Sequence, residues 1–213
     1  MKIIKAGYEI MTPLNRKEIL KYLEIAGRTC YKSEDKITDT SASKFVRMLV
    51  KLGHEAMIEH YNITVKITCD RGVSHEIVRH RIASYGQEST RYCNYSKNKF
   101  GNEITVIEPC FWDKDSEVYK QWEMACQQAE QVYFNLLKNG ATPEEARSVL
   151  PNSLKTEIVV TMNMRSWRNF FKLRTANDAH PQIREVARPL LAELQQQLPE
   201  LFDDITVECE AIS

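Results

Sequence analysis

The chain has few of the features that mark membrane, secreted or polyanion-binding proteins. Its 213 residues carry 29 Lys and Arg against 29 Asp and Glu, so the formal net charge is zero. Without a global field, any anion site must be built locally from neighbouring side chains. No apolar run approaches the roughly 20 residues that span a bilayer, and MKIIKAGYEIMTP lacks the apolar core of a signal peptide. We expect a cytoplasmic protein without a membrane segment.

Paired cysteines and glycine-rich phosphate loops are also missing. The six cysteines form no CxxC pair, so we expect reduced thiols. They are Cys30, Cys69, Cys93, Cys110, Cys126 and Cys209. Neither GxGxxG nor GxxxxGK[ST] occurs, so a bound phosphate must contact side chains and helix ends.

A zinc site of the HExxH type is excluded by spacing. The segment HEIVRH places His75 and His80 five positions apart. On a helix this separation leaves the two rings about 140° off one face, whereas zinc ligands need the i, i+4 spacing. We therefore expect no metal site.

Local patterns predict a mixture of strands and helices. The alternation in YNITVKITCD (61–70) is typical of a strand with one buried face, and TEIVVTM (156–162) predicts a second buried strand. Further strands are expected at 2–10 and 103–109, and helices at 15–31, 41–52, 73–84, 115–138, 163–174 and 181–198, the last interrupted by Pro189. The order shows no regular βαβ repeat. We predict an α+β (mixed α/β) fold, a single domain over residues 1–213 with a mostly antiparallel sheet packed by helices.

Several predictions concern helix faces and ends. Thr142, Pro143 and Glu145 form a capping-box pattern at a helix start, and Gly53 suits a left-handed helix exit. The residues expected to be buried are Phe45, Val46, Leu49 and Leu52 in the second helix, Val73, Ile77, Val78 and Ile82 in the third, and Val118, Trp122, Ala125, Ala129, Val132 and Leu136 in the fourth.

Positive charge is concentrated in RHRIASYGQESTRY, residues 79–92. A guanidinium group is permanently charged and offers paired donors that match phosphate oxygens, so Arg79, Arg81 and Arg91 suit a nucleotide or dinucleotide diphosphate. Taken alone, RHR is more often a solvated helix face with surface ion pairs. The turn at 86–89 adds amide, carboxylate and hydroxyl groups, which together favour a recognition loop.

A second polar group lies on or beside the helix expected at 163–174. Asn163 and Arg165 are expected to precede its first turn, Asn169 follows four residues after Arg165, and Arg174 lies at its end. These residues either bind a second anion or merely border a core face made of Trp167, Phe170, Phe171 and Leu173.

Three alternative interpretations stay open at this point. Cys93 lies in a polar neighbourhood that could activate a thiol, although a half-buried packing role is the simpler explanation. Arginines beside Tyr85, Tyr92 and Tyr95 could track and stack single-stranded nucleic acid, although zero net charge argues against it. An oligomerisation protein with an ion-paired surface is the third.

Arg79-His80-Arg81, seven residues and then Ser89 resembles the RHR-x7-S signature of the flavin-dependent thymidylate synthases. GHEAMIEH upstream, ARSVLP around Arg147 and NMRSWRNFFKLR downstream follow the family's order, so the resemblance covers about residues 50–185. It implies an FAD-dependent methyltransferase that converts dUMP to dTMP. FAD reduced by NADPH is the implied hydride source and 5,10-methylenetetrahydrofolate the carbon donor, without a cysteine nucleophile.

The resemblance also implies roles for individual residues. Arg174 is implied to be catalytic, because a fixed cation beside the uracil ring favours ionisation at N3. The implied cofactor-binding residues are His54, Ala56, Glu59, Arg79, His80, Arg81, Gln87, Asn163, Arg165 and Asn169. The implied substrate-binding residues are Glu76, Arg79, Gln87, Glu88, Ser89, Arg91, Arg147 and Arg174.

Four positions depart from the family pattern. Gly86 and Gln87 stand where the family carries Asn and Glu, Ala56 replaces a hydroxyl residue, and Glu76 replaces a glutamine. Main-chain contacts survive such changes, whereas side-chain hydrogen bonds do not. The resemblance further implies a homotetramer with active sites at subunit interfaces, with dUMP as partner and no nucleic acid or membrane partner.

Overall fold

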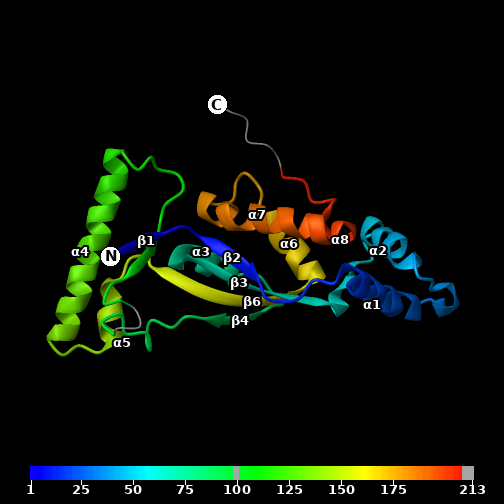
Figure 1. Ribbon diagram of the computed structural model, residues 1–213, viewed down its shortest axis with the longest axis horizontal. Helices are drawn as coiled ribbons and strands as arrows, with labels where there is room; N and C mark the ends of the chain where they lie inside the picture. The colour runs from blue at the N-terminus through cyan, green and yellow to red at the C-terminus, as the bar shows by residue number, and fades with distance from the viewer. Residues whose placement is uncertain (98–100, 208–213) are drawn as a thin grey trace. The chain divides into compact units, whose positions relative to one another are not determined.

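The computed structural model describes residues 1–97 and 101–207 (Figure 1). These residues group into two compact units. Unit 1 comprises Met1–Gly7, Ile67–Arg79 and the described part of Gly86–Val159. Unit 2 comprises Tyr8–Lys66, His80–Tyr85 and the described part of Val160–Ser213. Each unit is therefore built from three chain segments. That the whole chain is a single domain stays a prediction.

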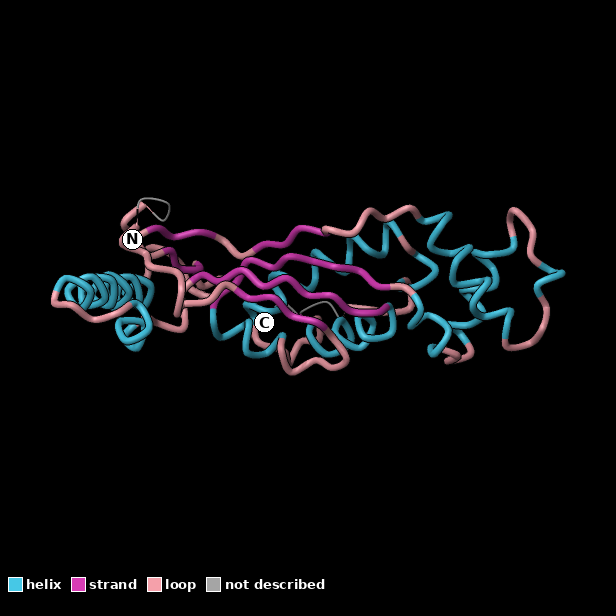
Figure 2. Tube along the Cα trace, turned by 90° about the horizontal axis from the view of Figure 1, so that it is seen from below, coloured by secondary structure: helices cyan, strands magenta, loops and turns pink. Residues whose placement is uncertain are grey.

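A four-stranded sheet contains the longest strands. It has the order β2–β3–β6–β4, with β2 at Gly7–Ile10, β3 at Asn62–Asp70, β6 at Lys155–Asn163 and β4 at Ser84–Gln87. Figure 2 shows the strands in magenta. Met164 N donates to Tyr61 O at 3.1 Å, and the hydroxyls of Thr64 and Thr161 lie 2.9 Å apart. Residue numbers that rise on one strand while they fall on its neighbour mean that β3 and β6 are antiparallel. The predicted antiparallel sheet and both long strands are confirmed.

The segment 2–10, expected as one strand, is divided between two sheets. β1 (Lys2–Ile4) pairs in parallel with β5 (Thr105–Ile107), whereas β2 begins at Gly7. Glu108 N donates to Ile4 O at 2.8 Å, where the β1 pairing ends. Apolar content alone did not reveal this change of partner.

Unit 2 holds α6 together with the helices α7 and α8 and the short helix η2 that pack against it, and it also holds α1, η1 and α2. These elements are α1 (Arg16–Thr29), η1 (Glu34–Lys36), α2 (Ser41–Lys51), η2 (Glu55–His60), α6 (Met164–Arg174), α7 (Pro181–Gln197) and α8 (Pro199–Phe202). Figure 1 shows α1 beside α2 and α6 beside α7. Trp167, Phe170 and Phe171 are fully buried and contact one another through their rings. The predicted core face of this helix is confirmed for these three residues.

Unit 1 holds the remaining helices. They are α3 (Arg71–Ile77), α4 (Glu117–Lys138), α5 (Pro143–Ala146) and η4 (Arg147–Val149). The capping box at Thr142 and Glu145 is confirmed. The predicted buried face of α4 is confirmed in part: Trp122 and Leu136 are half-buried against the core cluster, whereas Val118 and Val132 are exposed. The buried residues of this helix are Tyr119, Cys126 and Tyr133. A buried tyrosine needs a hydrogen-bond partner, and the hydroxyl of Tyr119 finds one 3.0 Å away in Glu108.

The RHR motif does not lie on a helix. α3 ends at Ile77, and the segment between α3 and β4 is irregular. Ile82, expected to be buried, is 83% exposed. Leu52 is likewise exposed, because α2 ends at Lys51 before the left-handed Gly53. Pro189 lies within α7, which continues through it, so the predicted interruption is also wrong.

Candidate functional site

Unit 2 contains a cavity of about 400 Å³, here called the α6 cavity. Its lining residues are Glu55, Glu59, Arg81, Ile82, Asn163, Arg165, Ser166, Asn169 and Lys172. Arg165, Asn169 and Lys172 follow one another at i, i+4 and i+7, which places them on one face of α6. The lining carries three cationic and two acidic side chains, so positive charge is in excess.

The N-terminus of α6 lies at this cavity. Asn163 is the N-cap, and its Oδ1 accepts a hydrogen bond from Ser166 N at 2.8 Å. Arg165 is therefore the second residue of the helix rather than a residue ahead of its first turn, which corrects the sequence prediction. The partial positive charge of a helix N-terminus adds to that of the cations. An anionic ligand fits this donor set.

Two carboxylates order the cations of the α6 cavity. Glu59 accepts a 2.6 Å hydrogen bond from Arg165 Nη1 and raises the pKa of Arg165 above its ordinary value. Glu55 lies 3.7 Å from Arg165 Nε and accepts a 3.0 Å hydrogen bond from Arg168 Nε. The buried Arg168 is in turn bound by Asp204 at 2.6 and 2.7 Å.

The C-terminal end of α6 carries the predicted catalytic arginine. Arg174 Nε donates to His80 Nε2 at 2.9 Å. His80 is 5% exposed, and its ring meets the edge of the buried Phe170 ring at a centroid distance of 4.9 Å. Burial, with the neighbouring Arg174, lowers the pKa of His80 to about 4. The imidazole is therefore neutral at pH 7 and able to accept this hydrogen bond.

The predicted cofactor-binding residues are only partly brought together. Those that line the α6 cavity are Glu59, Arg81, Asn163, Arg165 and Asn169. His54, Ala56 and His80 belong to the same unit without lining this cavity, and Arg79 and Gln87 belong to unit 1. Glu55, Ser166 and Lys172 were missed. The i+7 spacing of Lys172 from Arg165 was a usable signal, whereas nothing in the sequence distinguished Glu55 from other surface acids.

Unit 1 contains a second cationic cavity of about 430 Å³, here called the Arg147 cavity. Arg71, His75, Thr90, Glu144, Arg147, Ser148, Leu150, Pro151, Asn152 and Leu154 line it. Arg147 Nη1 donates to Thr90 Oγ1 at 3.4 Å, and Arg91 forms a 3.0 Å ion pair with Glu144. Arg147 is thus the predicted substrate-binding residue that lines this cavity. Arg71 and His75, separated by one helical turn, were missed.

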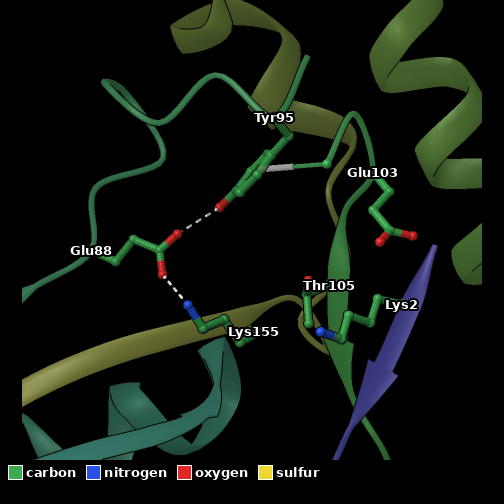
Figure 3. A pocket seen from close by; sticks show the side chains of 7 residues that line it. Lys2, Glu88, Tyr95, Glu103, Thr105 and Lys155 are labelled. Atoms are coloured by element: carbon green, nitrogen blue, oxygen red, sulfur yellow. Dashed lines mark hydrogen bonds and ion pairs between the residues drawn. The ribbon is translucent and has the colours of Figure 1, made fainter. Parts of the chain in front are cut away.

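Glu88 lies in a third cavity of about 340 Å³, lined by Lys2, Glu88, Tyr95, Gly101, Glu103, Thr105 and Lys155 and here called the Glu88 cavity. Its carboxylate points toward Lys155 Nζ at 3.0 Å and accepts a hydrogen bond from the Tyr95 hydroxyl at 3.3 Å (Figure 3). Burial alone would lower the pKa of Lys155, but the carboxylates of Glu88 and Glu157 raise it overall. The Glu88 side chain is therefore engaged within unit 1.

The other predicted substrate-binding residues of unit 1 lie near α3 and β4. Gln87 Nε2 donates to Ser74 Oγ at 2.9 Å and to Thr156 Oγ1 at 3.3 Å. A glutamate in this position has no amide group to donate, so the departure from the family pattern has a structural counterpart. Ser89 Oγ accepts from Arg91 N at 3.3 Å. Glu76 is half-buried on α3, and Arg79 is exposed.

The described cysteines form no disulfide with one another. Burial raises the pKa of Cys69 to about 12 and also raises that of Cys126. Cys93 is half-buried and packs against the core cluster that contains Tyr95 and Tyr133. Cys209 lies outside the described residues.

The described ranges hold neither a metal-binding cluster nor a membrane-spanning helix. Across residues 1–97 and 101–207, no three or more His, Cys, Asp and Glu side chains are grouped so that they could bind a metal ion. No helix in those ranges combines the length and apolar character needed to cross a membrane.

Comparison with known proteins gives concordant matches. The family model described as Thymidylate synthase complementing protein matches residues 15–200. The flavin-dependent thymidylate synthase of Pyrococcus furiosus is 36% identical, over 80% of this chain and 70% of that protein. That of Corynebacterium glutamicum is 34% identical, over 95% of this chain and 85% of that protein.

A solved structure extends the comparison to the fold. The crystal structure of the UMP/dUMP methylase PolB from Streptomyces cacaoi, bound with 5-Br dUMP, matches with a TM-score of 0.77 and 21% identity. The match covers 95% of this chain and 96% of that one, which shows a shared fold. The family model and the relatives confirm the resemblance indicated by the RHR motif. The chain belongs to the family of flavin-dependent thymidylate synthases.

Proposed function

We propose that this chain converts dUMP to dTMP by reductive methylation. FAD reduced by NADPH is the hydride source, and 5,10-methylenetetrahydrofolate is the carbon donor. Family membership supports the flavin and the product. The observation that carries the proposal is the α6 cavity, in which Arg81 and Arg165, far apart in the sequence, line one cation-rich space.

The residues of the α6 cavity fit a flavin dinucleotide. Its diphosphate needs cationic and amide donors, and Arg81, Arg165 and Lys172 supply the cations beside the N-terminus of α6. Glu55 and Glu59 both pair with Arg165, so this donor is ordered before a ligand binds. When bound, FAD supplies the hydride transfer that no protein side chain provides.

We assign the phosphate of dUMP to the Arg147 cavity. Arg71 and Arg147 provide permanent charges there, and Thr90 and Ser148 provide hydroxyl groups. Ser89 and Arg91 flank Thr90 in sequence and keep the substrate-binding roles implied by the resemblance.

We also propose that the protein is a cytoplasmic homotetramer. Its subunit interfaces would let residues of different subunits complete one active site.

Arg174 is proposed to act on the uracil ring by electrostatics. Its guanidinium stays charged throughout the reaction, and a fixed cation stabilises negative charge that develops on the ring without any reorganisation. Two of the described cysteines are unsuited to act as a thiol nucleophile. Cys69 and Cys126 are buried, and their raised pKa values disfavour the thiolate. The Ser89 hydroxyl accepts a hydrogen bond from Arg91 N, which fits a binding role.

An anaerobic assay of dUMP methylation tests this proposal. We expect dTMP only when FAD, NADPH and methylenetetrahydrofolate are all present, and purified protein that is yellow or becomes yellow with FAD. dUMP should perturb the flavin spectrum. A colourless protein that resists reconstitution, and that binds single-stranded nucleic acid with steep salt dependence, would instead support the nucleic-acid alternative.

A further inference from the structure

We infer that His80, the central residue of the RHR motif, positions the guanidinium of Arg174 through its imidazole rather than contacting a flavin with that side chain. The inference rests on the role proposed above for Arg174 against the uracil ring. His80 thereby connects a motif at residues 79–81 with the far end of α6.

The hydrogen bond from Arg174 to His80 holds the atom that sets the orientation of the Arg174 guanidinium group. Arg174 is the last residue of α6, and its Nε donates to His80 Nε2 at 2.9 Å. Nε is the guanidinium nitrogen nearest the side-chain stem. Because the group is planar, fixing Nε also fixes the plane in which the two terminal nitrogens lie. A long side chain is thus ordered before the substrate arrives.

His80 is itself held on several sides. Its ring lies against the Phe170 ring at an interplanar angle of 64°, and Phe170 is completely buried. Its main-chain carbonyl accepts a 2.6 Å hydrogen bond from the Tyr85 hydroxyl. With only 5% of the residue exposed, the imidazole has little surface to offer a large planar ligand. These contacts favour a supporting role for the ring.

The hydrogen bond also specifies the protonation state of His80. Nε2 accepts, so the single proton of the neutral ring lies on Nδ1. A protonated imidazole would lose the acceptor and place a second cation beside Arg174. Burial and the neighbouring guanidinium, which keep the ring neutral, therefore maintain this contact.

A pair of substitutions separates the acceptor from the bulk of the ring. In His80→Gln, the amide oxygen can occupy the place of Nε2, whereas His80→Phe keeps the flat ring and removes the acceptor. We expect His80→Gln to retain kcat within about threefold and His80→Phe to lose roughly 30-fold to 100-fold, with the KM for dUMP nearly unchanged. Thermal unfolding and circular dichroism control for the fold.

A readout without turnover makes the test independent of the proposed function. In flavin-free protein labelled with 15N-arginine, the Nε–H resonance of Arg174, assigned by its loss in Arg174→Lys, should survive in His80→Gln and shift or broaden in His80→Phe. An unchanged resonance in a folded His80→Phe protein would overturn the inference. Equal loss of kcat in both His80 variants would do the same. If His80→Phe does not fold, the Arg174 Nε–H resonance measured in His80→Gln tests the inference alone, and loss of that resonance would overturn the inference.

A double-mutant cycle completes the design. If His80 acts through Arg174, then His80→Phe in an Arg174→Ala background should lower kcat by less than about twofold. A full additional loss would assign His80 an independent role and contradict the inference. Full turnover of Arg174→Ala itself would instead contradict the catalytic assignment of Arg174, while the resonance would still report on its positioning.

Discussion

The α6 cavity and the Glu88 cavity are both rich in charged side chains, yet their charges are organised differently. Three cations and two carboxylates line the α6 cavity, at the N-terminus of a helix. Two lysines and two glutamates line the Glu88 cavity, where Lys155 pairs with Glu88 and Glu157. A local excess of charge favours a ligand of opposite sign, whereas a balanced set is satisfied internally. The excess, rather than the number of charges, marks a candidate ligand site.

The largest expected effect concerns Arg174 at the end of α6. Arg174→Ala should lower kcat for dTMP formation by about 10²-fold to 10³-fold, because it removes a preorganised charge that acts on the transition state. Arg47→Ala is a matched control, since Arg47 forms an exposed ion pair with Asp203 in the same unit. Steady-state kinetics under anaerobic conditions measures both variants. Unchanged turnover in Arg174→Ala would show that the catalytic assignment is wrong.

The next effect tests the charge excess in the α6 cavity directly. Arg165→Ala should weaken FAD binding roughly tenfold to 100-fold, because a charge-assisted hydrogen bond to a phosphate is lost. Flavin titration followed by fluorescence quenching gives the Kd, again with Arg47→Ala as the control. Equal affinities for the two variants would remove the distinction between the α6 cavity and an ordinary ion-paired surface.

His80 should make unit 2 sensitive to acid. Its pKa is about 4 in the folded protein against an ordinary 6.5, so the unfolded chain binds an extra proton between these values. Neutral His80 contributes to the free energy of unfolding in full above pH 6.5, and this contribution is lost as the pH falls toward 4. The free energy of unfolding should therefore fall by about 2 kcal/mol between pH 7 and pH 5. Urea unfolding at the two pH values measures it. His80→Gln should lose this part of the pH dependence; an identical slope in the variant would assign the acid sensitivity to other groups.

A smaller effect is expected from the balanced Glu88 cavity. Lys155→Met should lower the free energy of unfolding by about 1.5 kcal/mol, because it leaves the half-buried Glu88 carboxylate without its cation. The double variant Lys155→Met/Glu88→Gln should recover part of that loss, since no unpaired charge remains. Urea unfolding of both variants provides the comparison. A double variant less stable than Lys155→Met alone would contradict the view that the pair is self-contained.

Cys93 should give the smallest effect. Cys93→Ala should change kcat by less than about threefold, since the thiol is proposed to pack beside Tyr95 and Tyr133 rather than to react. The anaerobic assay checks this prediction, and circular dichroism confirms the fold. Complete loss of turnover in folded protein would restore the thiol mechanism.

The sequence predictions succeeded where the interacting residues lie close together in the sequence. β3 follows from period-two alternation, and the cap at Thr142 needs only its neighbour three residues away. On α4 the prediction fails at Val118 and Val132, because Tyr119 and Tyr133 are buried in their place and their hydroxyls find partners in the fold. The end of α3 was wrong because apolar spacing continues past the last helical residue.

The candidate site shows the same division. The sequence groups Asn163, Arg165, Asn169 and Arg174 on or beside one expected helix, and the family resemblance gives the first three a cofactor role. These three line the α6 cavity, whereas Arg174 does not. Glu55 was missed because its importance comes from Arg168, 113 residues away in sequence. Lys172 lies seven residues after Arg165 on the same helix face, a spacing that the sequence alone shows.

The sequence by itself determined the family, through motifs at residues 79–92 and 163–174, and it determined the secondary structure wherever periodicity or a local cap was sufficient. Only the tertiary structure decided which charges have partners. Arg165 meets Glu59 across 106 residues of sequence, and Arg174 meets His80 across 94. A hydrogen bond of about 3 Å between such residues requires two distant segments of the chain to lie side by side in the folded protein. Composition and spacing do not show which distant segments meet, so the supporting role of His80 became visible only in the folded protein.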